Sequence, residues 1–516
     1  MRFISLLFLL LVSAAMLFAV SLPDGSTAIV KETVVQKLPN FSTPLFSPDA
    51  ARFALVVGEK QRYLLCAGKK SPVYDSLIAD YSPGGKHLVY MAQRGEDTII
   101  AIDGVVQPAE VRDVHYSDDD AHAAFIVAKK FVIKVADKGT GALPASKEIT
   151  QDKEAIRING KEGPPYDSIS SFSWSADGKH FFYIASKGSS ECLVVDGTAS
   201  AELYDATTIH AQFSPDSAHL AMVAQRKGKW TFCLDGAVKK DSYDALVGPL
   251  FSTDSRHVAI IAQRKGEAGE SFSAVIDGVE GCWYKRVDSF HFSPDGLHYV
   301  YSAQKTTDRC TIVQDGKELK EYPITLWPSF SHDSKHLGYF VWCEEANKLG
   351  HTFIKGFAVV DGKETKSYDK VLRPAQSTGL IYSPDSQRWV FPAKYFWTTE
   401  AEAKAHNYPD QDLLVTSEGT EYRHQRASGI DSDTLTFSSD SRHLAYFIRS
   451  GGDGFDGYAL AIDGVQVTDS YSTLYKDSAA RFPIFTAPDK LFFYVGKDTA
   501  DSSALVKVEV TIKDKG

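Results

Sequence analysis

Short apolar runs recur along the chain, each beginning just after a polar turn. Examples are HLVYMAQ after Lys86, HLAMVAQ after Ala218, HVAIIAQ after Arg256 and HLAYFIR after Arg442. Runs of this length that are rich in β-branched and aromatic residues predict β-strands. The pattern therefore predicts a chain of many short strands.

A tetrapeptide close to Phe-Ser-Pro-Asp precedes these runs. Pro presets φ in the turn, Asp tolerates the next position, and the Ser hydroxyl can accept a hydrogen bond from the turn's amides. Ser175, Ser214, Ser252, Ser293 and Ser331 follow one another at intervals of 39, 38, 41 and 38 residues. Eleven copies begin at Phe46, Tyr81, Tyr116, Trp174, Phe213, Phe251, Phe292, Phe330, Tyr382, Phe437 and, in decayed form, Thr486.

A second signal, Asp-Gly or Asn-Gly, ends the next apolar run. Between apolar runs these dipeptides predict a tight hairpin, because both central residues of a type I′ turn need positive φ. Tyr-Asp dipeptides mark the segment that follows. The glycines of this signal are Gly104, Gly160, Gly197, Gly236, Gly278, Gly316, Gly362 and Gly464.

Each repeat therefore contains four short antiparallel strands in about 40 residues, which is typical of a propeller blade. We predict an all-β β-propeller built from about eleven four-stranded blade repeats. Because common rings hold about 4 to 8 blades, we expect two rings, approximately residues 22–300 and 301–516. The alternatives are one large ring and a propeller with extra sheet modules. The alternating stretch from Thr27 could supply a strand that the last repeat lacks, so that the chain ends share a blade.

The repeats resemble the WD-like, Ser-Pro-Asp propeller repeats of TolB-type periplasmic proteins and of prolyl-oligopeptidase-type enzymes. The resemblance covers nearly all of residues 46–500 and implies a propeller fold. TolB-type proteins have an α/β domain before the propeller, and the enzymes carry a hydrolase domain. Neither domain is evident here, since too few residues precede the first repeat and no GxSxG motif occurs.

The N-terminus and the charge bear on location and partners. Arg2 followed by an apolar run from Phe3 to Val20 predicts a secretory signal peptide, residues 1–21, cleaved after Ser21. An uncleaved anchor is the alternative. We expect an exported protein, periplasmic or extracellular, with no membrane span after cleavage. The 56 Lys and Arg against 66 Asp and Glu give a net charge of −10, which argues against nucleic acid as a partner.

Residues with potential chemistry are mostly explained by the repeat. Eight His residues follow the motif Ser by five positions, which predicts a structural role and not a metal site: His87, His122, His180, His219, His257, His298, His336 and His443. The six Cys show no CxxC spacing, and we interpret them as free, mainly buried thiols, although export would permit disulfides. We predict no catalytic residue, metal or cofactor.

Four insertions interrupt the regular spacing: 137–162, 343–356, 392–412 and 449–458. Loops carry most binding functions. The third contains Tyr395, Phe396, Trp397 and His406, which we predict to bind a peptide or a sugar; alternatively, the aromatic residues only attach the insertion to its own blade. The predicted function is a non-catalytic scaffold that binds a protein or envelope component. The alternative is a propeller enzyme acting on glycans or peptides.

Overall fold

A computed structural model describes residues 17–38, 42–136, 146–267, 269–346, 352–372, 379–396, 410–424, 427–450, 457–475, 483–499 and 502–514. These residues form 48 strands and no helix, so the predicted all-β class is confirmed. Accordingly, no helix among them has the length and apolar character needed to cross a membrane. The chain divides into two compact units: a central unit, Thr43–Phe330, and a terminal unit, Met1–Ser42 with Ser331–Gly516.

The central unit contains seven antiparallel sheets in which strands from one repeat lie in chain order. Their strands are β3 (Ser42–Phe46), β4 (Phe53–Val57), β5 (Tyr63–Cys66), β6 (Lys69–Lys70); β7 (Ser76–Tyr81), β8 (Leu88–Arg94), β9 (Asp97–Ile102), β10 (Val105–Val106); β11 (Val111–Tyr116), β12 (Ala123–Ala136), β13 (Ser146–Ile158), β14 (Lys161–Glu162); β15 (Ser168–Trp174), β16 (Phe181–Lys187), β17 (Ser190–Val195), β18 (Thr198–Ala199), β19 (Tyr204–Asp205); β20 (His210–Phe213), β21 (Leu220–Arg226), β22 (Lys229–Leu234), β23 (Ala237–Tyr243); β24 (Ala245–Phe251), β25 (Val258–Gly266), β26 (Gly269–Ile276), β27 (Val279–Glu280); β28 (Arg286–Phe292), β29 (Tyr299–Thr306), β30 (Arg309–Gln314), β31 (Lys317–Glu318).

Four further sheets follow the same plan. An eighth begins with β32 at the end of the central unit, and the last joins both ends of the chain. Their strands are β32 (Ile324–Phe330), β33 (Leu337–Ala346), β34 (Thr352–Val360), β35 (Lys363–Glu364); β36 (Lys370–Val371), β37 (Ile381–Tyr382), β38 (Trp389–Phe396), β39 (Asp410–Thr416), β40 (Glu421–Arg423); β41 (Ala427–Phe437), β42 (Leu444–Ser450), β43 (Gly457–Ile462), β44 (Val465–Gln466); and β45 (Thr473–Leu474), β46 (Ile484–Ala487), β47 (Lys490–Thr499), β48 (Ser502–Lys513) with β1 (Leu17–Ser21) and β2 (Thr27–Leu38).

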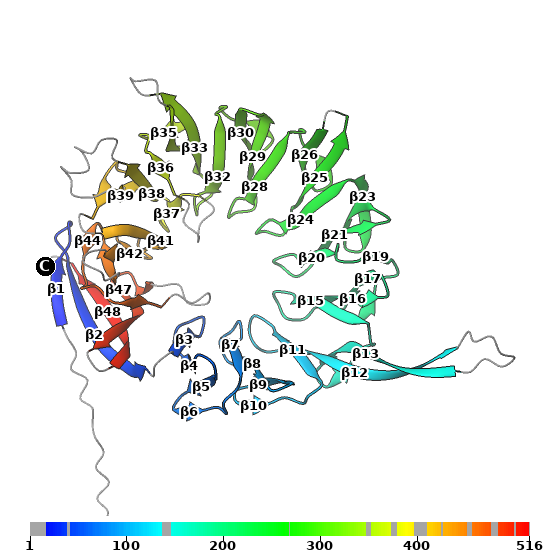
Figure 1. Ribbon diagram of the computed structural model, residues 1–516. Coiled ribbons are helices and arrows are strands. Elements are labelled where there is room, and N and C mark those ends of the chain that lie inside the picture. Colours follow the sequence, from blue (N-terminus) through cyan, green and yellow to red (C-terminus); the bar gives the residue numbers. More distant parts are fainter. Residues whose placement is uncertain are drawn as a thin grey trace, which may run out of the picture. The chain divides into compact units, whose positions relative to one another are not determined.

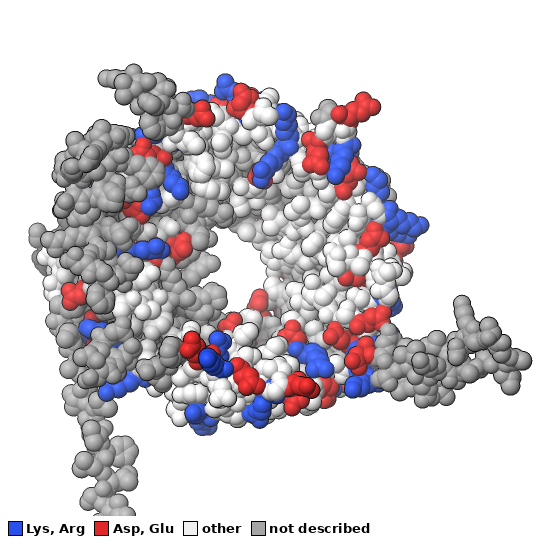
Figure 2. Space-filling model, viewed as in Figure 1, with Lys and Arg blue, Asp and Glu red and all other residues white. Residues whose placement is uncertain are grey.

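The described part of the chain thus holds eleven blade-type sheets, which confirms the predicted β-propeller class. In the central unit, successive sheets stand side by side in sequence order, with the first strand of each toward the inside of an arc (Figure 1). Figure 2 shows charged side chains of both signs along the outer border of this unit, where the short fourth strands lie. The first strands β15, β20, β24 and β32 contain no Asp, Glu, Lys or Arg.

The Ser-Pro-Asp turn is held by its own side chains. Ser214 Oγ donates to Asp216 Oδ1 at 2.6 Å and accepts from the backbone N–H of His219 at 2.9 Å. Ser217, the next residue of the turn, has a φ of 65°. The motif Ser bridges both ends of the turn, so its hydroxyl is fully hydrogen-bonded and can be buried. Ser214 is 1% exposed.

The Asp-Gly turn has the predicted geometry. Asp235 and Gly236 have φ values of 52° and 75°, as a type I′ hairpin requires. The turn joins β22 and β23, which confirms the predicted order of strands within a repeat.

The recurrent His joins these two turns. His219 Nδ1 lies 2.9 Å from Asp235 Oδ2, while Asp235 Oδ1 accepts the backbone N–H of Leu220 at 2.9 Å. The structural interpretation is confirmed for seven of the eight His residues by pairs at 2.7–2.9 Å: His87–Asp103, His180–Asp196, His219–Asp235, His257–Asp277, His298–Asp315, His336–Asp361 and His443–Asp463. The eighth, His122, has its ring centroid 5.7 Å from that of Trp174.

Neighbouring sheets bury apolar faces against each other. Phe232 of β22 packs in one cluster with Leu246, Val258 and Ile260 of the next sheet. Burial of such a side chain contributes about 1.5–3 kcal/mol. Polar contacts also cross the interface, because Ser255 Oγ accepts the backbone N–H of Asp216 at 2.9 Å.

The two ends of the chain meet in one sheet. β2 pairs with β48 from Thr27↔Lys513 to Leu38↔Ser503, so the segment from Thr27 supplies a strand to the last repeat. β1 pairs with the outer side of β2 and comprises the last five residues of the predicted leader.

Candidate binding site

All four insertions occupy the same connection, that between the second and third strands of a sheet. They fall between β12 and β13, β33 and β34, β38 and β39, and β42 and β43. First and third strands run in the same direction, so the Ser-Pro-Asp and Asp-Gly turns lie at one end of each sheet and the insertions at the other. The tips of the insertions, 137–145, 347–351, 397–409 and 451–456, lie outside the described residues.

Of the four predicted binding residues, the structure describes the side chain of Tyr395 alone. Its ring centroid lies 5.3 Å from that of Tyr368, and the cationic groups of Lys366 and Arg423 lie 5.0 and 5.4 Å from its centroid. Phe396 ends β38, opposite Asp410.

Trp397 and His406 lie outside the described residues. The predicted grouping of four residues stays a prediction.

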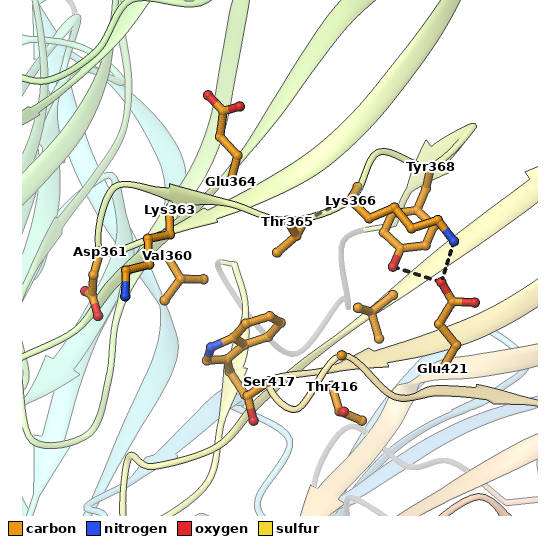
Figure 3. Close-up of a pocket in the computed structure, with 13 residues that line it drawn as sticks. Val360, Asp361, Lys363, Glu364, Thr365, Lys366, Tyr368, Thr416, Ser417 and Glu421 are labelled. Carbon is orange, nitrogen blue, oxygen red and sulfur yellow. Dashed lines mark hydrogen bonds and ion pairs between the residues drawn. The ribbon is translucent and has the colours of Figure 1, made fainter.

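Next to Tyr395, a pocket of about 680 Å³ separates the β34–β35 hairpin from strands β38–β40 (Figure 3). Both sides belong to the terminal unit. We call it the Trp389 pocket. Its lining comprises Val360, Asp361, Lys363, Glu364, Thr365, Lys366, Tyr368, Trp389, Val415, Thr416, Ser417, Gly419 and Glu421.

One end of the pocket is a charged cluster. Glu421 Oε1 lies 3.1 Å from Lys366 Nζ and accepts a hydrogen bond from the Tyr368 hydroxyl at 3.2 Å, as Figure 3 shows. Burial acts to raise the pKa of Glu421, but Arg423 and Lys366 outweigh it and hold that pKa below its ordinary value. Burial raises the pKa of Tyr368, which therefore stays protonated and donates.

The charged cluster is also a structural device, because it recurs between other sheets. In each case the Tyr at the end of one repeat donates to a Glu of the adjoining sheet, and a Lys or Arg pairs with that Glu. The other examples are Tyr243–Glu280–Arg264, Tyr284–Glu318–Lys305 and Tyr471–Glu32–Lys497. The cluster alone therefore does not distinguish the Trp389 pocket.

The end of the pocket at Trp389, away from the charged cluster, differs from the other repeats. Trp389 is half-buried, and no other repeat has a tryptophan six residues after the motif Ser. Several repeats have Leu or Val there, as in Leu220 and Val258, and others have a smaller aromatic ring, as in Phe181. The hydroxyl-bearing Thr416 and Ser417 line the same end. Lys363 is exposed, and no hydrogen bond or ion pair joins its ammonium to a described residue.

The sheet beside Trp389 also departs from the repeat. Arg388 stands where most other sheets have His, and Glu418 stands in the turn where most have Asp. Arg388 Nε and Glu418 Oε1 are 3.2 Å apart. Arg388 Nη1 also donates to the backbone carbonyls of Ser441 and Arg442, both at 3.0 Å, and so reaches the next sheet.

Sequence reasoning missed Trp389, Lys363 and Glu421. The replacement of His by Arg388 and the loss of Asp-Gly in that repeat do not single it out, because the first repeat also has Arg52 in the His position and Ala67-Gly68 in the turn. Within the described residues, no group of three or more His, Cys, Asp or Glu side chains is placed to hold a metal ion.

No model of a protein family matches this chain, and no curated protein matches its sequence. Among solved structures, one described as that of the eukaryotic initiation factor is 12% identical, covering 82% of this chain and 96% of its own, with a TM-score of 0.36. TolB from Acinetobacter baumannii is 12% identical over 60% of this chain and 79% of its own, with a TM-score of 0.23. The β-propeller domain of the Trilobed protease from Pyrococcus furiosus is 14% identical over 61% of this chain and 96% of its own, with a TM-score of 0.25. Likeness of this degree says nothing about what this chain binds.

Proposed function

We propose that this chain is an exported, non-catalytic propeller scaffold that binds a protein, or another envelope component, at the Trp389 pocket. The observation that carries the proposal is the half-buried Trp389 ring beside two hydroxyl side chains and Lys363, whose ammonium has no hydrogen-bond or ion-pair partner among the described residues. A tryptophan offers a large rigid contact area and is enriched in the residues that dominate binding energy. Other repeats fold with Leu, Val, Phe or Tyr at this position, so the fold does not require the larger indole ring.

A polypeptide ligand fits the surrounding backbone. β35 and β40 are the outermost strands of their sheets, and both border the pocket. The outer edge of such a strand presents N–H and C=O groups to which an extended segment can hydrogen-bond. In this mode of binding, specificity comes from pockets that receive every second side chain of the bound segment, and the Trp389 pocket is placed to be one of them.

Groups with catalytic potential at this site already have structural partners. Asp361 is bonded to His336 at 2.7 Å and to the backbone N–H of Leu337 at 3.0 Å. Glu421 is held in the Tyr368 cluster. These contacts favour binding over general acid–base chemistry.

The test is site-specific crosslinking with the full chain. A photoreactive residue at Ser417 should crosslink one polypeptide from an envelope fraction, and Trp389→Ala should reduce the yield at least tenfold. Lys363→Glu, a change at an exposed side chain, should also reduce it. Trp283→Ala is the matched control, because Trp283 is half-buried in the central unit beneath Arg264.

Equal crosslinking in the Trp389 and Trp283 variants would refute the proposal. Turnover of peptides or glycans by the purified chain, lost in Glu421→Gln, would replace the scaffold by the enzyme alternative.

A further inference from the structure

A second feature, in the central unit, concerns the first strands of the sheets. Four residues before the motif Ser, several of these strands place a residue with positive φ, a conformation rarely adopted by residues other than Gly. These residues are Ser171, Gly248, Ser289 and Trp327. In β15, β24 and β28 they coincide with a shift in strand register, which defines a β-bulge. Bulges re-aim side chains and are common beside functional sites.

Two of the bulged strands, β24 and β28, belong to adjacent sheets (Figure 1). Between them lies a pocket of about 660 Å³, within the range of small-molecule sites. We call it the bulge pocket. A Cβ on Gly248 would lie 3.2 Å from the carbonyl oxygen of Ala259, so the backbone of β24 approaches β25 closely at this point. The pocket walls are apolar: Val247, Leu250, Ile261, Phe272, Val287 and Phe290.

Two of these apolar side chains are open to solvent. Val247 is 69% exposed and Leu250 is 38% exposed, although both belong to a strand that carries no charge. Covering them would remove apolar area from water, which favours a ligand with an apolar body.

The rim adds one uncompensated positive charge. Glu270 pairs with Lys265 at 3.3 Å, and Asp288 pairs with Arg286 at 2.5 Å. Lys285 also lines the pocket, and among the described residues no carboxylate lies within ion-pair distance of its ammonium. Among the groups that lower the pKa of Asp308, Lys285 contributes least.

We propose that the bulge pocket binds a small molecule with an apolar body and a carboxylate, with the carboxylate at Lys285 and the apolar body against Val247, Leu250 and Phe272. The bulges create the space, and Lys285 sets the sign of the charge. This site lies in the central unit and does not depend on the function proposed for the Trp389 pocket.

Calorimetric titration of the full chain tests the proposal with three probes. Decanoate should bind once per chain. Decyltrimethylammonium, which has the same apolar chain and the opposite charge, should bind at least tenfold more weakly. An acetylated dipeptide ending in phenylalanine tests whether the pocket prefers the carboxyl terminus of a polypeptide. Tighter binding of this probe than of decanoate would overturn the assignment to a small molecule.

Variants locate the site. Val247→Glu should weaken decanoate binding at least tenfold, and Lys285→Gln should remove the preference for decanoate over the cation. Ile78→Glu is the matched control: Ile78 is 74% exposed on the first strand of another sheet, and its substitution should leave affinity unchanged. No saturable binding of decanoate, or equal losses in the Val247 and Ile78 variants, would overturn the proposal.

Discussion

At the scale of single residues, the Asp of the Asp-Gly turn combines two tasks. Asp235 adopts a positive φ, and its two carboxylate oxygens accept from the backbone N–H of Leu220 and contact the ring of His219. One short side chain therefore ties the third strand of a sheet to the start of the second. Asn-Gly would form the same turn, but only a carboxylate offers two oxygens for these two contacts, which explains why Asp recurs.

Gly236 tests this turn. Its φ is 75°, and an added Cβ would meet nothing within 4 Å, so the cost of a side chain lies in the backbone conformation, about 1–2 kcal/mol. We expect Gly236→Val to lower the free energy of unfolding by at least that amount in urea denaturation.

Gly266→Val is the control, because Gly266 is exposed and lies outside the positive-φ region. Gly451, an alternative control, lies outside the described residues. Equal losses of unfolding free energy in Gly236→Val and Gly266→Val would show that the Asp-Gly turn does not impose backbone strain.

His443 predicts a pH dependence. Its side chain is 3% exposed, and the hydrogen bond to Asp463 raises its pKa, with Asp24 adding to the effect while burial and Arg442 oppose it. A raised folded-state pKa stabilises the protein fully below the unfolded pKa of about 6.5, and this contribution disappears as the pH rises through the raised value.

The loss caused by His443→Gln should therefore be larger at pH 5.5 than at pH 8.5, measured by urea denaturation at both values. His219→Gln is the comparison, since the His219 side chain is 46% exposed and solvent screens its pair with Asp235. A pH-independent loss at His443 would contradict the argument.

At the scale of elements, the sheet that joins the chain ends depends on β2 more than on β1. β2 lies between β1 and β48 and buries Ala28, Val30 and Glu32; the Glu32 carboxylate accepts from the Tyr471 hydroxyl at 2.8 Å. β1 pairs with β2 alone. Signal cleavage after Ser21 would therefore remove an outer strand and leave the β2–β48 pairing intact.

We expect a chain that starts at Leu22 to melt within a few degrees of the full chain. A chain lacking residues 1–38 should melt much lower, because β48 then exposes its edge and Tyr471 loses Glu32. Calorimetric melts of both chains decide the matter, and similar melting of the two truncated chains would mean that β2 contributes little.

At the scale of the whole molecule, regular repeats and departures from them are distributed unequally. The central unit contains the evenly spaced repeats and one long hairpin, β12–β13. The terminal unit contains three of the four insertions, the Arg388–Glu418 pair and the Trp389 pocket. In a modular array each sheet contacts mainly its neighbours, so a binding feature can be added to one sheet without altering the others.

The strand order and both turns of the repeat follow from the amino-acid sequence alone, because each depends on contacts between residues close along the chain. Ser214, Asp216 and His219 lie within five residues, and the Asp235 side chain reaches Leu220 over fifteen. Turn residues with special backbone requirements identify such contacts directly.

The two proposed ligand pockets, in contrast, depend on how the sheets pack against each other. The Trp389 pocket requires Lys366 and Glu421, 55 residues apart, to meet across two sheets, and the bulge pocket requires β24 and β28 to bulge beside each other. Packing between sheets sets these distances, and no local pattern encodes them. The sequence named Tyr395 together with the other aromatic residues of its insertion, but its contacts with Lys366 and Tyr368 followed only from the way the two sheets pack.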